Sequence, residues 1–301
     1  MTPAIDARFL KLGRKTVTEH LAETSDLFSR ILVAVDLTDI TKPLLHWAFG
    51  LAQRFKSEVY VAHIIPSYGD SGSGNQAEQR LRQLLDSINE AANRHSILIA
   101  QEPLSNAIER FVLEHQIDLV IAATHGATSK PSAPLGSGAE QIFRSATCPV
   151  LLIGPQVLQS AAWLMSVENI LLATDYHSTS AACSYAISLA QQFAAQLIVL
   201  HVVEDPGATL REPLDHIRDI HMQRMRHAFH AIGPEIKINF SVKFGQAAGE
   251  ILIAAKDNHA NLLVMGAKPT THWAQGVPLS TAYRVLAEAS CPVLSVRADV
   301  S

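Results

Sequence analysis

The sequence predicts an α/β fold that is built twice, as two doubly wound parallel sheets in tandem. Three observations predict it: an internal repeat, short apolar runs rich in β-branched residues, and segments of helical period between those runs. In the repeat, Ile31-Leu-Val-Ala-Val-Asp36 recurs as Ile170-Leu-Leu-Ala-Thr-Asp175, and Cys148-Pro-Val-Leu-Leu-Ile153 recurs as Cys291-Pro-Val-Leu-Ser-Val296. Alternating strands and helices are typical of βα units, and hence of a parallel sheet that helices cover on both faces.

Hydrophobic period and turn residues place five strands and four helices in each copy. In the first copy we expect strands at 31–36, 58–65, 97–101, 118–123 and 149–153, and helices at 42–55, 76–94, 104–116 and 137–146. In the second copy we expect strands at 169–174, 196–203, 236–243, 261–266 and 292–297, and helices at 179–194, 210–231, 246–259 and 280–289. The offset between the copies is 139 residues from Asp36 to Asp175 and 143 from Cys148 to Cys291, so one small insertion separates them.

The chain therefore divides into four parts. These are a partly amphipathic N-terminal segment at 1–29 that we expect to be helical, a first domain at 30–154, an apolar linker at 155–167 that we expect to pack on the domains, and a second domain at 168–301. The last strand of each domain presents an apolar edge, at Val150–Ile153 and Val293–Val296. Because exposed edges favour pairing, we expect these strands to join the domains as an intramolecular pseudo-dimer, with a homodimer of whole chains as a further option.

Composition excludes several classes of protein. The 301 residues carry 24 basic and 28 acidic side chains, for a net charge of −4, and the mean hydropathy is +0.14. This balance argues against nucleic acid or an anionic membrane as a partner. No secretory signal and no apolar run of membrane-spanning length is present. Three cysteines, Cys148, Cys183 and Cys291, are too few for a disulfide framework, and we expect buried, reduced thiols in the cytoplasm.

One loop of the first copy has the composition of a phosphate site. Ala123-Thr-His-Gly126 is followed by nine residues and then by Gly136-Ser137-Gly138 at the start of a predicted helix. Glycines let the backbone approach a phosphate closely, and a helix N-terminus offers unpaired N–H groups and the positive end of a dipole. The alternative interpretation is an ordinary turn at Gly126 and an ordinary helix cap at Gly136.

These motifs together resemble the universal stress protein family, and the tandem arrangement is similar to its two-domain members. The nucleotide motif of that family is Gly, two residues, Gly, nine residues, and Gly followed by Ser or Thr. The first copy matches at Gly126, Gly136 and Ser137, with Ala123 in place of the first glycine. The resemblance covers about 31–153 and 169–297, and it implies a Rossmann-like fold of the adenine nucleotide alpha hydrolase type, with strand order 3-2-1-4-5 in each five-stranded sheet.

The resemblance also implies a ligand and its contacts. The ligand is ATP or a related adenine nucleotide, with or without Mg²⁺, bound in the first domain. The site residues it implies are Asp36 beside the adenine or ribose, Ile64 or Ile65 at the adenine edge through backbone groups, Ala123 near the ribose, His125 near the phosphates, and Gly126, Gly136, Ser137 and Gly138 around ribose and phosphates. Asp36 has the alternative of capping the turn that follows it, which we take as the role of Asp175.

Both copies depart from the family motif. In the first, Lys130-Pro-Ser-Ala-Pro134 brings two prolines, which stiffen the loop and remove two N–H donors. In the second, Gly266 is kept, but Pro269 and Leu279 replace the second and third glycines and leave Ser280-Thr281. We therefore expect the second copy to bind no ATP, or to bind it much more weakly.

The predicted function is a cytoplasmic stress-response regulator that binds an adenine nucleotide in its first domain and contacts unidentified protein partners. One alternative is a nucleotide-free scaffold, which the Ala123 and proline departures favour. Another is an enzyme of the related hydrolases, but Asp36-Leu-Thr-Asp39 stands where such an enzyme needs a Ser-Gly-Gly loop. Motifs of P-loop NTPases, serine hydrolases, zinc proteases and dinucleotide enzymes are absent. We assign no catalytic or metal-binding residue, and at most slow ATP hydrolysis.

Several histidines need a separate interpretation. His63 and His201 end the second strands, and we expect them to be structural histidines that face the interior. His216, His221, His227 and His230 cluster in one predicted helix of the second copy. His227 and His230 could share a metal, but no ligand set is complete, so a solvated polar face is the preferred interpretation.

Overall fold

The structure is a computed structural model of the chain. It describes residues 27–65, 73–88, 94–125, 135–159, 167–175, 180–204, 213–229, 236–267 and 281–297. Of the N-terminal segment 1–29 that we expect to be helical, residues 1–26 lie outside the described residues, as do residues 160–166 of the linker, and residues 27–29 form a turn before the first strand.

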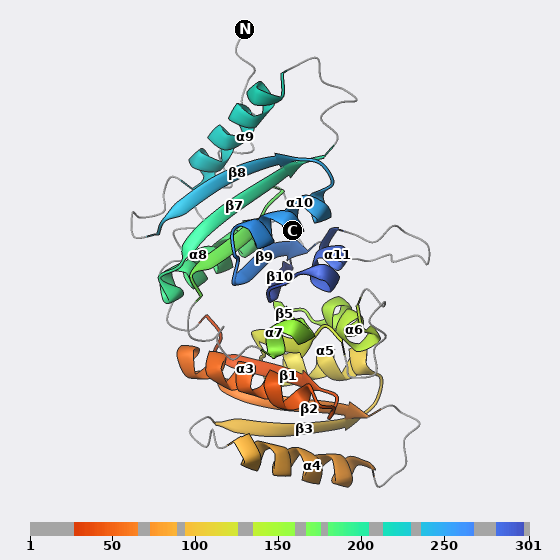
Figure 1. Cartoon of the computed structure of the whole chain (residues 1–301). Helices are drawn as coiled ribbons and strands as arrows, with labels where there is room; N and C mark the ends of the chain where they lie inside the picture. The colour runs from red at the N-terminus through yellow and green to blue at the C-terminus, as the bar shows by residue number, and fades with distance from the viewer. Residues whose placement is uncertain are drawn as a thin grey trace.

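In its described residues the first copy has five strands and four helices that alternate along the chain (Figure 1). They are β1 (Arg30–Val35), α3 (Thr41–Phe55), β2 (Glu58–Ile65), α4 (Ser73–Ile88), β3 (His95–Gln101), α5 (Leu104–Glu114), β4 (Leu119–Ala123), α6 (Ser137–Ser145) and β5 (Val150–Ile153). A short helix, α7 (Pro155–Leu158), follows with its last two side chains buried. The expected elements are all present, with β3 beginning two residues earlier than expected.

The second copy repeats this order. Its elements are β6 (Asn169–Ala173), α8 (Ser180–Phe193), β7 (Gln196–Val203), α9 (Leu214–Ala228), β8 (Ile238–Phe244), α10 (Ala247–Asp257), β9 (Leu262–Ala267), α11 (Thr281–Glu288) and β10 (Val293–Arg297). Its helix α9 is shorter than the expected 210–231, because Pro213 precedes its first turn.

All ten strands form a single sheet with the order β3-β2-β1-β4-β5-β10-β9-β6-β7-β8. Each copy has the expected order 3-2-1-4-5 with parallel pairing. The fifth strands pair antiparallel, with Leu294 opposite Leu151 and Val293 opposite Leu152, which confirms the expected contact. This pairing joins the two expected five-stranded sheets into one and removes an exposed edge from each copy.

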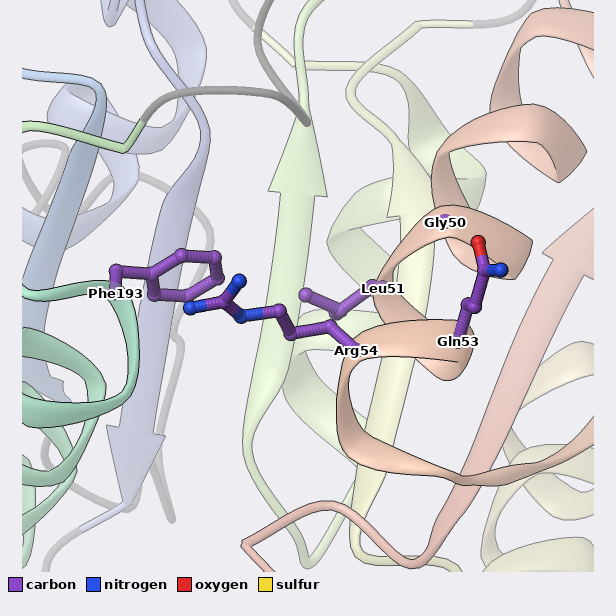
Figure 2. A pocket seen from close by; sticks show the side chains of 5 residues that line it. All are labelled: Gly50, Leu51, Gln53, Arg54 and Phe193. Carbon is purple, nitrogen blue, oxygen red and sulfur yellow. The ribbon is translucent and has the colours of Figure 1, made fainter.

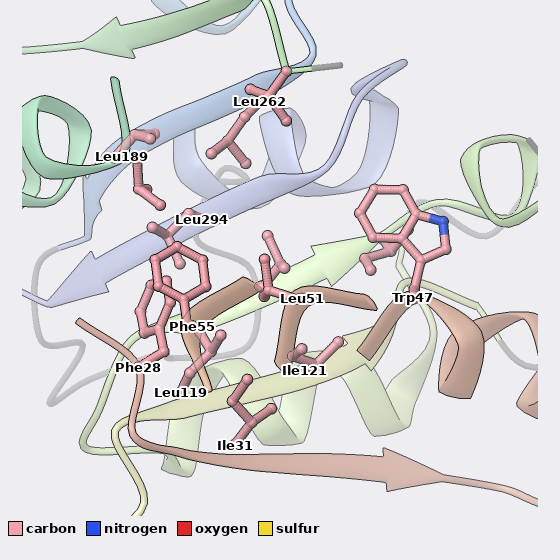
Figure 3. Close-up of a cluster of buried hydrophobic side chains, with 14 of the residues drawn as sticks. Phe28, Ile31, Trp47, Leu51, Phe55, Leu119, Ile121, Leu189, Leu262 and Leu294 are labelled. Carbon is pink, nitrogen blue, oxygen red and sulfur yellow. The ribbon is translucent and has the colours of Figure 1, made fainter. Parts of the chain in front are cut away.

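The hydrophobic core continues through both copies on each face of the sheet. On one face, Phe28 and Phe55 of the first copy pack with Leu189 and Leu294 of the second (Figure 3). The ring of Phe28 lies 5.2 Å from that of Phe55 and stacks at 5.8 Å on that of Tyr185, measured between ring centroids. The copies therefore share one core as well as one sheet.

Equivalent polar residues fasten the start of β1 and of β6. Asp118 accepts hydrogen bonds from the backbone N–H groups of Ser29, at 2.7 Å, and Arg30, at 3.1 Å. Asn261, at the matching position of the second copy, accepts two at 2.9 Å from residues 168 and 169. Burial raises the pKa of Asp118 to about 6, although the N–H donors favour the charged form. The same connection is thus made by an ionisable carboxyl group in the first copy and by a neutral amide in the second.

Asp118→Asn is expected to stabilise the protein at pH 7.5 by about 1 kcal/mol. A pKa above the ordinary 3.8 in the folded state means that folding penalises the carboxylate, so the wild type gains stability as the pH falls through 6 toward 4. The asparagine variant loses this dependence. Urea denaturation at pH 7.5 and pH 5 measures both effects, with Asn261→Asp as the reverse control. Equal stability of wild type and Asp118→Asn at both pH values would contradict the expectation.

Candidate functional site

The carboxyl ends of three neighbouring strands and one helix N-terminus meet in the first copy. Asp36 directly follows β1, Ile65 ends β2, and Ala123 ends β4. Because β2, β1 and β4 are adjacent and parallel, these residues lie along one edge of the sheet. This is where open α/β sheets bind ligands. The sequence-predicted residues that the structure describes are brought together here.

Helix α6 begins beside this edge without a capping side chain. Gly136 is its N-cap, with φ −65° and ψ 144°, and no side chain of the described residues caps the helix there. The Gly136 N–H donates to the Thr124 carbonyl at 2.9 Å, and the Glu140 N–H donates to the Gly136 carbonyl at 2.9 Å. The N–H groups of Ser137, Gly138 and residue 139 therefore have no acceptor within the helix. This is the arrangement that anion sites use.

Thr124 anchors the end of β4, a role that the sequence analysis missed. Its side chain is buried, and its N–H donates to the Ile153 carbonyl at 2.9 Å. Its hydroxyl lies 3.0 Å from Nδ1 of His125, whose ring is half-exposed at the start of the loop. The only signal of this role in the sequence is a threonine next to the glycine motif.

Asp36 caps the turn that follows β1, which is its alternative interpretation. Its Oδ1 accepts hydrogen bonds from the Thr38 N–H at 3.1 Å, from the Thr38 hydroxyl at 2.6 Å and from the Thr41 hydroxyl at 3.4 Å. Leu37 between them has φ 59°. Within the part of the chain that the structure describes, Oδ2 accepts no hydrogen bond. A ligand contact by Asp36 stays a prediction, and Oδ2 is the atom available for it.

Ile64 and Ile65 extend beyond the end of β1. Pairing of β2 with β1 ends at His63 opposite Val35, whereas pairing with β3 continues to Ile65 opposite Gln101. Since successive residues of a strand direct their backbone groups to opposite sides, one isoleucine directs its N–H and C=O past the end of β1. The backbone contact expected of Ile64 or Ile65 is open to one of them.

Of the remaining predicted residues of the motif, the structure describes Ala123 and Gly138 but not Gly126. Ala123 is half-buried and pairs with Ile153. A methyl group added at Gly138 would lie 3.8 Å from Leu104, which is an ordinary van der Waals contact, so packing within the protein does not require a glycine there. Gly126 lies outside the described residues, as do 126–134 and the departures of the second copy at 268–280.

The histidines at the ends of β2 and β7 are structural, as expected. Nδ1 of His63 lies 2.9 Å from the Val35 carbonyl, and Nδ1 of His201 lies 2.8 Å from the Thr174 carbonyl. The two bonds join equivalent positions of the copies. Each imidazole therefore connects neighbouring strands.

The solvated face expected of the α9 histidines is only partly correct. His216 and His227 are exposed, and His230 lies outside the described residues. His221 instead stacks on His201, with ring centroids 4.5 Å apart. Burial, with smaller contributions from His201 and Arg224, lowers the pKa of His221 to about 4. Among the described residues, no group of three or more His, Cys, Asp or Glu side chains is placed to hold a metal ion.

The thiols lie away from the candidate site. Cys291 is buried as expected, whereas Cys148 and Cys183 are only partly buried and pack against the core. Burial raises the pKa of both Cys148 and Cys291 to about 12, so these thiols stay protonated at neutral pH. None of the described helices is long and apolar enough to cross a membrane.

A hollow of about 250 Å³ lies between the C-terminal turn of α3 and the end of α8 (Figure 2). Gly50, Leu51, Gln53, Arg54 and Phe193 line it. The Arg54 guanidinium spans it, 4.9 Å from the centre of the Phe193 ring, and donates to the Gln192 carbonyl. The hollow thus holds a contact between the copies and is separate from the N-terminus of α6.

Comparison with known proteins identifies the family. The model of the Universal stress protein family matches residues 27–154 and 166–297. The chain belongs to the universal stress protein family. A universal stress protein of Methanocaldococcus jannaschii is 26% identical to this chain over 141 residues. The aligned segment covers 42% of this chain and 83% of the relative. A universal stress protein of Thermus aquaticus is 26% identical over 136 residues, 42% of this chain and 99% of its own.

Solved structures support the same fold over nearly the whole chain. A universal stress protein from Archaeoglobus fulgidus matches with a TM-score of 0.71 and 18% identity, over 89% of this chain and 98% of the other. A putative universal stress protein from Pseudomonas aeruginosa matches with a TM-score of 0.65 and 20% identity, over 91% of this chain and 95% of the other. The chain is thus a tandem universal stress protein with the expected α/β fold.

Proposed function

We propose that the first copy binds ATP or a related adenine nucleotide, and that occupancy regulates how this stress protein engages its protein partners. The observation that carries the proposal is the start of α6, where Gly136 leaves three successive N–H groups without a capping side chain. Unpaired N–H groups and the helix dipole favour a phosphate at that position. The Gly126, Gly136 and Ser137 spacing of the first copy adds to this support.

The adjacent strand ends fit the remainder of a nucleotide. The backbone of Ile64 or Ile65, past the end of β1, is available to the polar edge of adenine. Oδ2 of Asp36 is an acceptor for a ribose hydroxyl, and His125 stands near the phosphate side. Mg²⁺, when it accompanies the nucleotide, would be held mainly by phosphate oxygens and water.

The second copy has a different role in this proposal. Pro269 removes an N–H donor and Leu279 adds a side chain where the motif has glycines, so we infer one nucleotide per chain. The proposal also includes two domains, at residues 30–154 and 168–301, that are joined by a linker. The sparse cysteines favour a reducing compartment, and the proposal includes a cytoplasmic location.

Calorimetric titration of the full chain with ATP tests the proposal, with an expected stoichiometry of one. Gly136→Asp places a carboxylate at the N-cap, where it accepts from the same N–H groups and repels phosphate. We expect at least tenfold weaker binding, about 1.4 kcal/mol. An aspartate N-cap also stabilises a helix, so a loss of binding would not reflect unfolding.

Leu279→Asp at the equivalent position of the second copy is the matched control, and it should leave the affinity unchanged. Undiminished binding by Gly136→Asp would refute the site. Two nucleotides per chain would refute the asymmetry. If ATP, AMP and cyclic AMP all fail to bind the wild type, the nucleotide proposal fails, and the scaffold function is the remaining one.

A further inference from the structure

The outer edge of β8 lies in a groove of the second copy. β8 is the last strand in the order of the sheet, and Figure 1 shows it as the outermost strand of the second copy, with α9 beside it. Helices α9 and α10 both contact β8, from opposite faces of the sheet. A groove of about 660 Å³ is lined by residues of both helices and of the strand, among them Met222 and Arg226 of α9, Phe240 and Ser241 of β8, and Asn258 at the end of α10.

Alternate residues of β8 direct their backbone groups to this edge. The Lys237 carbonyl accepts from the Leu197 N–H at 2.9 Å, so the backbone groups of every second residue from Lys237 onward face β7. The residues between them, Ile238, Phe240 and Val242, direct N–H and C=O to the outer edge. Ile238 and Phe240 also line the groove. The groove is therefore bordered by backbone donors and acceptors at the spacing of a strand.

The first copy has two aromatic rings at the positions where the second copy has the groove. Ile198 of β7 lines the groove, and Tyr60 occupies the equivalent position of β2 in the first copy. Asn258 is the C-cap of α10, as His115 is of α5. The rings of Tyr60 and His115 are in contact, with their centroids 4.7 Å apart. An aliphatic side chain and an amide replace this ring pair in the second copy, and the difference leaves room for a ligand.

The rim of the groove is basic. Arg226 lines the groove, Lys237 and Lys243 belong to the strand segment, and all three side chains are exposed. Neither 221–229 nor 236–244 contains an acidic residue, and the charges of Lys256 and Asp257 at the end of α10 compensate each other. Lysines on an edge strand disfavour pairing with the same edge of a second chain, whereas a basic surface attracts an acidic one.

The side chains that line the groove are apolar on one side and polar on the other. Met222 and Ile238 belong to the apolar layer under α9. Asn239 and Ser241 are the alternate residues of β8, and they point to the opposite face. An extended segment that pairs with β8 places every second side chain on each face. A segment with alternating apolar and acidic residues therefore matches both the lining and the charge.

We propose that the outer edge of β8 binds an extended acidic segment of a partner protein, which adds to the sheet as a further strand. In this mode of recognition, main-chain hydrogen bonds supply affinity, and pockets for alternate side chains supply selectivity. The surface lies in the second copy and is separate from the start of α6. The inference thus goes beyond the nucleotide site, and it gives the copy without the nucleotide motif a function of its own.

A fluorescein-labelled hexapeptide of alternating glutamate and valine tests the inference on the full chain, without nucleotide. We expect saturable binding by fluorescence anisotropy that weakens as salt is added, and at least tenfold weaker binding of a peptide with lysine in place of glutamate. Arg226→Glu should weaken binding of the acidic peptide at least tenfold. Arg224→Glu is the matched control, since Arg224 is exposed on the same helix but is not among the residues that line the groove. It should change the affinity less than threefold.

A second variant fills the groove. Ile198→Tyr combined with Asn258→His introduces the ring pair of the first copy, and it should weaken binding of the acidic peptide at least tenfold. Circular dichroism checks that this variant folds, and Arg226→Glu, at an exposed position, tests the same surface without a change in the core. Amide hydrogen exchange then detects pairing with the strand, because the N–H groups of Ile238 and Phe240 should exchange more slowly when the peptide is bound.

Four results would overturn the inference. The first is no binding of the acidic peptide at about 1 mM, and the second is equal binding of the acidic and the lysine peptide. The third is undiminished binding by Arg226→Glu, and the fourth is unchanged exchange at Ile238 and Phe240. If a second chain is the occupant instead, the protein will dimerise with rising concentration and the peptide will dissociate the dimer, which also overturns it. ATP titration tests the proposed function separately, so either can fail alone.

Discussion

Leu294→Asp is expected to lower the free energy of unfolding by about 4 to 5 kcal/mol. Leu294 is 1% exposed on β10 and lies opposite Leu151 of β5 in the pairing that joins the copies. It belongs to the core that runs through both halves (Figure 3). An aspartate there buries a charge without a partner and removes the apolar contacts of both halves. Urea denaturation followed by circular dichroism measures the loss.

Ser295→Ala is the matched control, at the next residue of the same strand. Ser295 is 2% exposed, and its hydroxyl has no hydrogen-bond partner among the described residues. Alanine removes a buried polar group that gains nothing, so stability should be unchanged or up to about 1 kcal/mol higher. Equal destabilisation by both substitutions would show that the strand tolerates no change, and that the charge is not the cause.

Phe28→Ala is expected to cost about 3 to 5 kcal/mol. The side chain is 2% exposed and packs on Phe55 of the first copy and Tyr185 of the second, so its removal opens a cavity at the centre of the shared core. Phe28→Leu keeps most of the volume and should cost less than half as much. Thermal and urea unfolding of the two variants and the wild type provide the comparison.

Leu113→Ala separates this effect from a general response to shortening a side chain. Leu113 on α5 is 72% exposed, so its truncation should change stability by no more than about 0.5 kcal/mol. A Phe28→Ala variant as stable as Leu113→Ala would mean that the aromatic contacts between the copies contribute nothing.

The fold could be predicted because the sequence contains its pattern in two copies. The repeat fixes the strands independently in each copy, and the strands and helices expected within the two copies are present within a few residues. The apolar edges of Val150–Ile153 and Val293–Val296 also indicated where the copies meet. Pairing into one continuous sheet depends on the antiparallel register of these two strands, which no local pattern specifies.

The candidate site was predictable only where the motif is local. Gly136 and Ser137 stand at a helix start as their spacing predicts, and the turn-capping alternative for Asp36 is the one its hydrogen bonds show. Contacts between distant residues carry no such signal. The shared fastening role of Asp118 and Asn261 becomes visible only with the backbone N–H groups in place.

The antiparallel junction of β5 and β10 lies within one polypeptide, and this determines how it responds to dilution. Two subunits that meet through the same strands would separate as their concentration falls below their dissociation constant. Here each half experiences the other at a fixed effective concentration set by the connecting chain. The pairing of Leu294 with Leu151 is therefore as complete at nanomolar as at micromolar protein.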